Sequence, residues 1–248
     1  MFDRPSTRTR VSFEAGVFEL GGHPLVLREG ELQLARGESP RDTALVLARM
    51  VHAIAIRTGP HATVEELAEH SEVPVINMLT HEHHPCQALA DLTTLRERFG
   101  RLEGLKLAYV GDGNNMARSL LIATRLAGIE MAIAAPSELA LPELASVELD
   151  EAVAGAHAIY TDVWVSMGDE EQAERKRELL APYRVDGKLL ARARDDAVVL
   201  HCLPAHPGEE ITEELLYGER SAVWDEAENR LHAQKALLEL LLSSVPPR

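Results

Sequence analysis

Short apolar runs alternate with longer amphipathic segments along most of this 248-residue chain. Many of the short runs are almost continuously apolar, which is typical of parallel strands covered on both faces. The longer segments repeat their apolar residues every three or four positions, as helices with one buried face do. This alternation predicts an α/β fold with mostly parallel sheets.

The pattern also gives the approximate extent of each element. The predicted strands span residues 24–27, 53–57, 73–77, 107–111, 131–135, 158–163, 198–203 and 222–225. The predicted helices span residues 7–20, 41–51, 64–71, 85–99, 115–127, 171–181, 212–217 and 226–243. Between residues 135 and 151 we expect only a connection rich in Pro and Leu.

Two doubly wound domains fit this order of elements. The predicted boundary lies near residues 100–104, after a long helix and before a new strand. We expect one domain over residues 1–99, completed by the C-terminal helix at 226–244, and a second domain over residues 100–225. The helices at 85–99 and 226–243 would join them.

The net charge of −15 narrows the range of partners. It disfavours general binding to nucleic acid or to an anionic membrane, so an anion site would need positive charge concentrated locally. Two cysteines, Cys86 and Cys202, make no disulfide framework and fit a reducing compartment. The N-terminus shows no apolar stretch of signal-peptide type, and we predict a cytoplasmic protein.

Candidate chemistry lies where predicted strands end, because ligands of open α/β sheets bind beyond the carboxyl ends of the strands. The polar positions that follow strands are Arg57, Asn77, the turn 111–115, the loop 162–168 and the stretch 201–204.

Residues 5–10 combine hydroxyl and guanidinium groups where a helix is predicted to begin. Ser6 is a favourable N-cap, and the amide groups it leaves at the helix start attract anions. Arg8 and Arg10 add forked donors suited to phosphate oxygens. A solvated helix end has the same composition, so this stretch alone leaves both interpretations open.

A second helix start carries His84 and Gln87 on one face, behind Pro85 at the first helical position. These side chains can bind a carbonyl oxygen and an amino group, although a plain helix start with an exposed His has the same sequence. The acidic and histidine residues at 81–84 lack the His-Glu-x-x-His spacing, since residue 85 is Pro, and we predict no metal.

The strand ends in the second half of the chain are more polar. The turn 111–115, Gly-Asp-Gly-Asn-Asn, lacks the third glycine of a dinucleotide loop. Its Asn side chains could hold a carboxylate or cap the next helix. Asp162, at the end of a strand, is suited to an ammonium group. Cys202 follows His201, but no Cys-His-Asn arrangement supports a nucleophile, and inert packing is the simpler interpretation.

The last helix carries Arg230 near its start. It could point back towards a ligand. The simpler alternative is a surface arginine that pairs with Glu226, one turn earlier.

Together these motifs resemble the aspartate/ornithine carbamoyltransferase family, and its ornithine-type members more than its aspartate-type ones. The resemblance is carried by residues 2–10, 84–91, 111–116, 162–168, 201–206 and 228–232. It implies two α/β domains in a homotrimer or a multiple of one. It also implies transfer of the carbamoyl group of carbamoyl phosphate to the side-chain amine of L-ornithine, which yields L-citrulline and phosphate. No metal or redox cofactor is implied.

The resemblance further implies a set of site residues. Carbamoyl phosphate would be held by Ser6, Thr7, Arg8, Thr9, Gln33, Arg57, His84, Gln87, Cys202, Leu203 and Arg230. Arg57, His84 and Cys202 would be the catalytic members of that set. Ornithine would be held by Asn115, Asp162, Ser166 and Met167.

Family members carry a helix and a buried strand before the stretch at 5–10, and this chain lacks them. We therefore expect neighbouring strands to lose a partner and a core face to lose its cover. Two other functions stay open at this point: a paralogue that binds a ligand or partner without turnover, and a carbamoyltransferase for a related amine. Asp162 and Asn115 argue against putrescine, which has no α-ammonium or α-carboxylate to hold.

Overall fold

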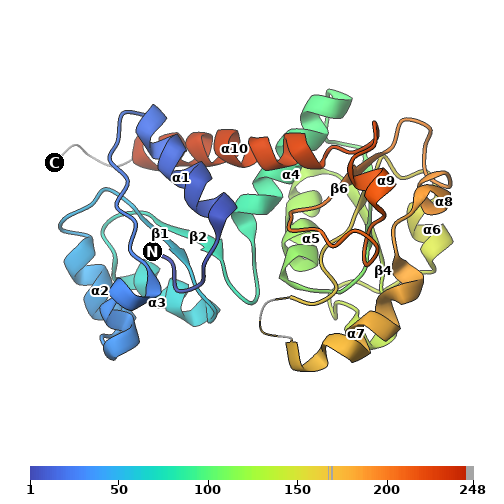
Figure 1. Cartoon of the computed structure of the whole chain (residues 1–248). Coiled ribbons are helices and arrows are strands. Elements are labelled where there is room, and N and C mark those ends of the chain that lie inside the picture. Colours follow the sequence, from blue (N-terminus) through green and yellow to red (C-terminus); the bar gives the residue numbers. More distant parts are fainter. Residues whose placement is uncertain (167, 169, 244–248) are drawn as a thin grey trace. The chain divides into compact units, whose positions relative to one another are not determined.

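The computed structural model describes residues 1–166, 168 and 170–243 (Figure 1). It contains two compact units: unit 1 comprises Met1–Ala90 and the chain from Arg230 onward, and unit 2 comprises Asp91–Asn229. The divisions fall within α4 (Pro85–Phe99) and α10 (Val223–Ser243). These are the two helices that the sequence predicted to run between the domains, and the predicted α/β class is confirmed.

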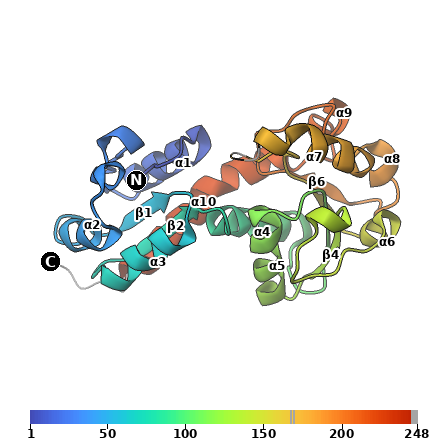
Figure 2. The same ribbon diagram turned by 90° about the horizontal axis from the view of Figure 1, so that it is seen from below.

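Unit 1 is built on the parallel pair β1 (Ile54–Arg57) and β2 (Val75–Leu79), with α3 (His61–His70) as the crossover. Figure 2 shows α3 alongside β2, and α2 (Pro40–Leu47) packs against α3. The inward-facing residues of β1 are buried in the same core as Leu67 of α3. The short 3-10 helices η1 (Glu29–Glu31) and η2 (Gln33–Arg36) follow α1 (Thr7–Glu19).

The predicted strand at residues 24–27 is wrong. The chain there is extended, but it meets its neighbours only through single bridges, and Pro24 cannot donate to a ladder. Phe2 bridges both residue 28 and Arg57 in parallel: its amide donates to Leu27 O (2.8 Å), and the Arg57 amide donates to Met1 O (3.1 Å). Residues 1–3 therefore pair with the end of β1, and Phe2 is buried against the core.

Unit 2 holds a four-stranded parallel sheet in the order β4-β3-β5-β6. The strands are β3 (Lys106–Val110), β4 (Glu130–Ala134), β5 (Ala158–Tyr160) and β6 (Val198–Leu200). The helices are α5 (Asn115–Ala127), α6 (Leu149–Val153), α7 (Ala173–Leu180), α8 (Gly187–Leu190) and α9 (Glu213–Leu216), with the 3-10 turns η3 (Ser137–Leu139), η4 (Glu170–Gln172) and η5 (Ala181–Tyr183).

The sheet of unit 2 is covered on both faces, as a doubly wound domain requires. Ala108, Val110, Ile159 and Val199 contribute to one core together with residues of α6, α8 and α9. The residues between them point the other way. On that face Tyr109 and Tyr160 stack with ring centroids 5.9 Å apart, and the Tyr109 hydroxyl reaches the start of α5.

Several predicted boundaries in unit 2 are also wrong. Residues 222–225 are not a strand, because α10 already begins at Val223. The strands predicted at 158–163 and 198–203 end at Tyr160 and Leu200. After the ends of these two strands, the backbone amide of His201 is hydrogen-bonded to a side chain instead of to the neighbouring strand. The connection at 135–151 is not free of helix, since it holds η3 and the start of α6.

A buried ion pair joins α7 to the turn after β3. Lys176 Nζ donates to Asp112 Oδ2 at 2.7 Å, and both side chains are less than a tenth exposed. Loss of one partner would leave an uncompensated charge, so this pair holds α7 in place. Among the helices of the described chain, none combines the length and the apolar character needed to cross a membrane.

Candidate active site

The start of α1 is only partly exposed, and its side chains are hydrogen-bonded to one another and to α10. The Ser6 hydroxyl accepts from the Thr9 amide (3.3 Å), so the predicted N-cap is confirmed. Ser6 also donates to Thr9 Oγ1 (3.0 Å), which accepts a second hydrogen bond from Arg230 Nη2 (2.6 Å). Thr9 is fully buried and Thr7 is exposed.

Arg230 is therefore not the surface arginine that the sequence also allowed. Its side chain is 3% exposed, and it binds Thr9 at the start of α1. Glu226 is buried as well, with partners of its own in unit 2.

In unit 1, burial and three arginine side chains act on the pKa of His84. Burial lowers the pKa of His84 well below its usual range, and the guanidinium groups of Arg230, Arg57 and Arg8 lower it further. The imidazole is therefore neutral at pH 7 and can donate one hydrogen bond without carrying a charge. Four segments far apart in the sequence supply this group: α1, the end of β1, the start of α4 and α10.

Two further predicted residues are buried in unit 1. Arg57 ends β1 and is 7% exposed, while Gln87, in the first turn of α4, is 1% exposed. Gln33 is different: it is exposed in η2, and among the described residues no side-chain contact joins it to the others.

Three guanidinium cations close enough to lower the pKa of a buried histidine have the chemistry to hold an anion. Burying a charged group costs several kcal/mol unless an opposite charge compensates it. Guanidinium groups bind phosphate oxygens in pairs, and the free amides at the start of α1 favour the same ligand. The geometry of unit 1 therefore fits a compact dianion better than any neutral ligand.

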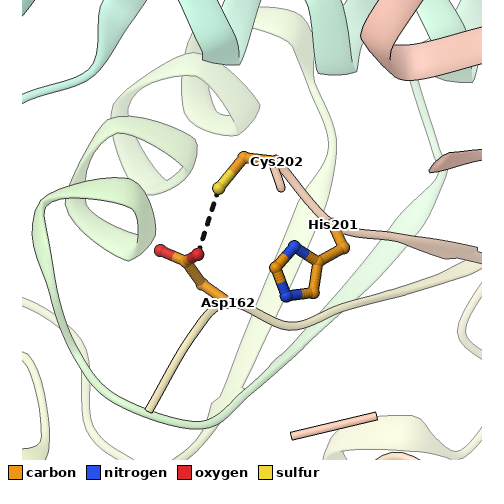
Figure 3. Close-up of side chains that lie close together, drawn as sticks. All are labelled: Asp162, His201 and Cys202. Carbon is orange, nitrogen blue, oxygen red and sulfur yellow. Dashed lines mark hydrogen bonds between the residues drawn. The ribbon is translucent and has the colours of Figure 1, made fainter. Parts of the chain in front are cut away.

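In unit 2 the site is organised by Asp162, just after β5. Its Oδ2 accepts from Asn114 Nδ2 (2.8 Å), and its Oδ1 accepts from the Val163 amide (2.8 Å) and from the thiol of Cys202 (3.0 Å). Figure 3 shows the Cys202 thiol directed at this carboxylate, with the His201 ring beside them. The carboxyl ends of β5 and β6 thus meet through side chains, as the parallel topology predicts.

Cys202 is held as a thiol. Burial raises its pKa well above the usual range, and the Asp162 carboxylate raises it further. A thiol of raised pKa is a poor nucleophile, which agrees with the sequence interpretation. Leu203, the next residue, has a φ of 59°, and its amide donates to His201 Nδ1 (2.9 Å). Such a left-handed conformation is strained for leucine and is concentrated at functional sites.

Asn114 and Asn115 have different roles, which the sequence did not separate. Asn114 caps α5 through Oδ1, which accepts from the Met116 (2.9 Å) and Ala117 (3.1 Å) amides, and its Nδ2 binds Asp162. Asn114 is therefore occupied by the protein, while Asn115 opens the helix and stays partly exposed. Gly113 permits this turn, since a Cβ there would lie 2.4 Å from Leu139 O.

The remaining predicted residues of unit 2 lie on the loop after Asp162. Ser166 is partly exposed, and Met167 lies outside the described residues. Cys202 and Leu203, which we assigned to carbamoyl phosphate, lie in unit 2 beside Asp162. Sequence reasoning missed Tyr109, Tyr160 and Glu226, because nothing in their local pattern marks a polar contact.

Two groups in the described chain have the composition of metal ligands. In the first, Asp162, His201 and Cys202, both nitrogens of the imidazole are engaged: Nδ1 accepts from Leu203, and Nε2 faces Glu210 Oε1 at 3.2 Å. The second group contains His206, Glu209 and Glu210, and the Glu209 carboxylate already binds Arg177 Nε (3.1 Å and 3.2 Å). Neither group therefore offers a set of uncommitted ligands.

These two units define a class of protein: an α/β protein in which one unit gathers arginines around a buried histidine and the other presents a carboxylate at its strand ends. The sequence matches the carbamoyl-P binding domain of the aspartate/ornithine carbamoyltransferases over residues 1–97 and their Asp/Orn binding domain over residues 103–241. The chain belongs to the aspartate/ornithine carbamoyltransferase family.

Individual relatives agree with this assignment. The ornithine carbamoyltransferase of Methanoculleus marisnigri is 52% identical over 256 residues, which cover 98% of this chain and 83% of the relative. The solved ornithine carbamoyltransferase from Pyrococcus furiosus is 46% identical with a TM-score of 0.94, covering 99% of this chain and 84% of that one. The Thermus thermophilus enzyme is 45% identical with a TM-score of 0.90, covering 98% and 84%.

The lowered pKa of His84 predicts a specific loss of stability in acid. The unfolded chain protonates this histidine below pH 6.5, whereas the folded chain keeps it neutral until its own lower pKa is reached. The folded state then binds fewer protons, so its stability is complete above pH 6.5 and falls as the pH drops towards that lower value. We expect the wild type to lose about 1.4 kcal/mol more per pH unit in this window than His84→Gln.

Urea unfolding of both proteins without ligand, followed by circular dichroism between pH 7 and pH 5, measures this difference. All other titrating groups are common to the two proteins and cancel. If the free energies of unfolding of the two proteins changed equally with pH, this would contradict a buried neutral His84.

Proposed function

We propose that this chain transfers the carbamoyl group of carbamoyl phosphate to the side-chain amine of L-ornithine and releases L-citrulline and phosphate. One observation supports this function above the others: three arginines surround a buried neutral His84 in the unit that matches a carbamoyl-phosphate domain. The Asp162 network in the unit that matches an amino-acid-binding domain supplies the complementary chemistry.

Carbamoyl phosphate takes the anion site in this proposal. Arg8, Arg57 and Arg230 hold its phosphate together with the start of α1, where Ser6, Thr7 and Thr9 lie; Gln87 and Gln33 complete the set. The carbonyl oxygen gains negative charge as the amine attacks. His84 and Arg57 stabilise that charge, because preorganised donors act strongly in a site closed to water.

Ornithine is placed by unit 2. Asp162 binds its α-ammonium group and Asn115 its carboxylate, and Ser166 and Met167 complete the ornithine set. Cys202 and Leu203 lie near the carbamoyl end. The attacking amine must lose its proton first, and removal from water lowers its pKa. The C–N bond forms, the bond to the phosphate oxygen breaks, and the departing phosphate accepts the proton. Positioning of two bound reactants supplies most of the rate.

In this assignment residues 1–99, completed by 226–244, form the carbamoyl-phosphate domain, and residues 100–225 form the ornithine domain. We further propose a homotrimer, or a multiple of one, in the cytoplasm. Large exposed apolar side chains on unit 1 support self-association, among them Val11 and Phe18 on α1, 58% and 75% exposed. Two free cysteines fit a reducing compartment.

Turnover is the first test of the proposed function. We expect the purified chain to form citrulline from carbamoyl phosphate and L-ornithine, and much less product from putrescine, which offers Asp162 no α-ammonium group. Colorimetric assay of the ureido group, which the carbamoylated products of both amines carry, measures this preference. A folded chain that forms no product with any amine would contradict the proposal.

Arg57→Ala tests the phosphate site. We expect the variant to lose a charge-assisted pair of hydrogen bonds to phosphate, at a cost of about 3 kcal/mol, which is a loss of affinity of about 100-fold or more. Binding is measured by calorimetric titration with carbamoyl phosphate. The exposed Arg49→Ala, in the same unit, is the control and should bind normally. Normal binding by Arg57→Ala would contradict the role assigned to Arg57.

Asp162→Asn tests the ornithine site. The amide keeps the shape of the carboxylate but not its charge, so we expect the KM for ornithine to rise about tenfold or more while the KM for carbamoyl phosphate changes little. Steady-state kinetics with each substrate varied in turn separates the two. Asp195→Asn, an exposed carboxylate of the same unit, is the matched control. Equal effects on both constants would argue against an ammonium contact.

A further inference from the structure

The backbone ladder between β5 and β6 ends one residue before the site. Its last hydrogen bond runs from the Thr161 amide to Leu200 O (3.2 Å). The next amide, that of His201, donates instead to Glu226 Oε2 (2.8 Å), a side chain from the first turn of α10. Glu226 Oε1 accepts from the hydroxyl of Tyr160, the last residue of β5 (3.2 Å). One carboxyl group thus bridges the ends of both strands.

The two residues that follow this bridge are those of the proposed site. Cys202 comes one residue after His201, and Asp162 comes two residues after Tyr160. Their own hydrogen bond, from Sγ to Oδ1, is 3.0 Å long. The position of the thiol against the carboxylate therefore depends on how the two strand ends are held, and Glu226 is the group that holds them.

Burial and charge fix the orientation of Glu226. Its residue is 1% exposed, and its side chain is also hydrogen-bonded to Asp91 of α4, which is fully buried. Burial raises the pKa of Glu226 well above its usual range, and the Asp91 carboxylate raises it further. A protonated Glu226 donates its hydroxyl to Asp91 and still accepts from Tyr160 and His201. The three contacts then engage its one donor and both of its oxygens, which favours a single orientation.

We propose that Glu226 is a positioning residue for carbamoyl transfer, which locks the carboxyl ends of β5 and β6 together and so sets the Cys202 thiol against Asp162. It does not touch substrate; it acts through the contact of Cys202 with Asp162, the residue proposed to bind ornithine. This inference rests on the proposed placement of Cys202 and Asp162 in the site.

Three variants separate this role from general stability. Glu226→Ala removes the bridge. Glu226→Gln keeps it, because the amide oxygen accepts from His201 while the amide nitrogen donates to Asp91 and to the Tyr160 hydroxyl, which can also accept. Asp225→Asn is the control: its carboxylate lies in the same helical turn, is half exposed and pairs with Arg98.

We expect Glu226→Ala to raise the KM for ornithine about tenfold, with a change below about twofold in the KM for carbamoyl phosphate. Glu226→Gln and Asp225→Asn should each stay within about threefold of the wild type in both constants. A double-mutant cycle with Cys202→Ala gives the decisive measurement. In the Cys202→Ala background, Glu226→Ala should raise the KM for ornithine by less than about twofold. The reason is that both substitutions remove the same contact between Cys202 and Asp162.

Each contrary result has a definite meaning. Full additivity with Cys202→Ala, or Glu226→Gln as damaging as Glu226→Ala, would overturn the positioning role while leaving citrulline formation intact. If Cys202→Ala has no effect on the kinetics of an active enzyme, the site assignment fails, and the inference fails with it. Absence of citrulline formation by the wild type would instead contradict the proposed function.

If Glu226→Ala does not fold, Glu226→Asp takes its place in the cycle, since it retracts the same carboxyl group by one methylene. It should raise the KM for ornithine and lose that effect in the Cys202→Ala background. Kinetics of Glu226→Asp identical to those of the wild type would overturn the proposal.

Discussion

The concentration of positive charge around a buried, neutral His84 is the constraint on which the rest of unit 1 depends. Arg8, Arg57 and Arg230 reach it from a helix start, a strand end and the last helix. Cations that share a buried space repel one another and lose hydration, so this arrangement requires packing that holds it and favours an anion as ligand. The hydrogen bond from Arg230 to Thr9 shows how α1 and α10 are tied together for this purpose.

Unit 2 concentrates negative charge, where unit 1 concentrates positive charge. Asp162, Asp91 and Glu226 bring three carboxyl groups close to Cys202, in a chain whose net charge is already −15. A proton on Glu226 reduces the negative charge of this cluster and lets Glu226 donate a hydrogen bond to a neighbouring carboxylate. The thiol hydrogen of Cys202 likewise forms a hydrogen bond with Asp162. In the proposed function the carboxylate of Asp162 binds the ammonium group of ornithine. One unit suits a phosphate and the other an ammonium, which is the pair of charges that the two proposed substrates carry.

Much of this organisation could be predicted from the sequence because parallel strands bring their carboxyl ends to one edge. Arg57, Asp162 and Cys202 were candidates for that reason alone, and the N-cap role of Ser6 followed from local chemistry. The errors occurred where tertiary contacts decide. Residues 222–225 have the composition of a strand, but packing makes them the start of α10. Glu226 looks like an ordinary acidic residue in a first helical turn, and only the sheet it meets makes it a buried acid.

The different roles of Asn114 and Asn115 could not be predicted from the sequence either. Asn114 and Asn115 are equivalent in sequence, but the turn at Gly113 directs one towards the protein and leaves the other at the helix start. The residues before α1 make a similar point. The sequence predicted strands that lack a neighbour in this unit, whereas the backbone of residues 1–3 pairs at the end of β1.

The central claim is that unit 1 carries an anion site built from arginine side chains around a neutral histidine. Calorimetric titration of the full chain with carbamoyl phosphate, without ornithine and at increasing salt, tests it most directly. We expect one equivalent to bind per chain, with an affinity that falls as salt screens the arginine charges. Failure to bind carbamoyl phosphate at low salt would contradict the claim.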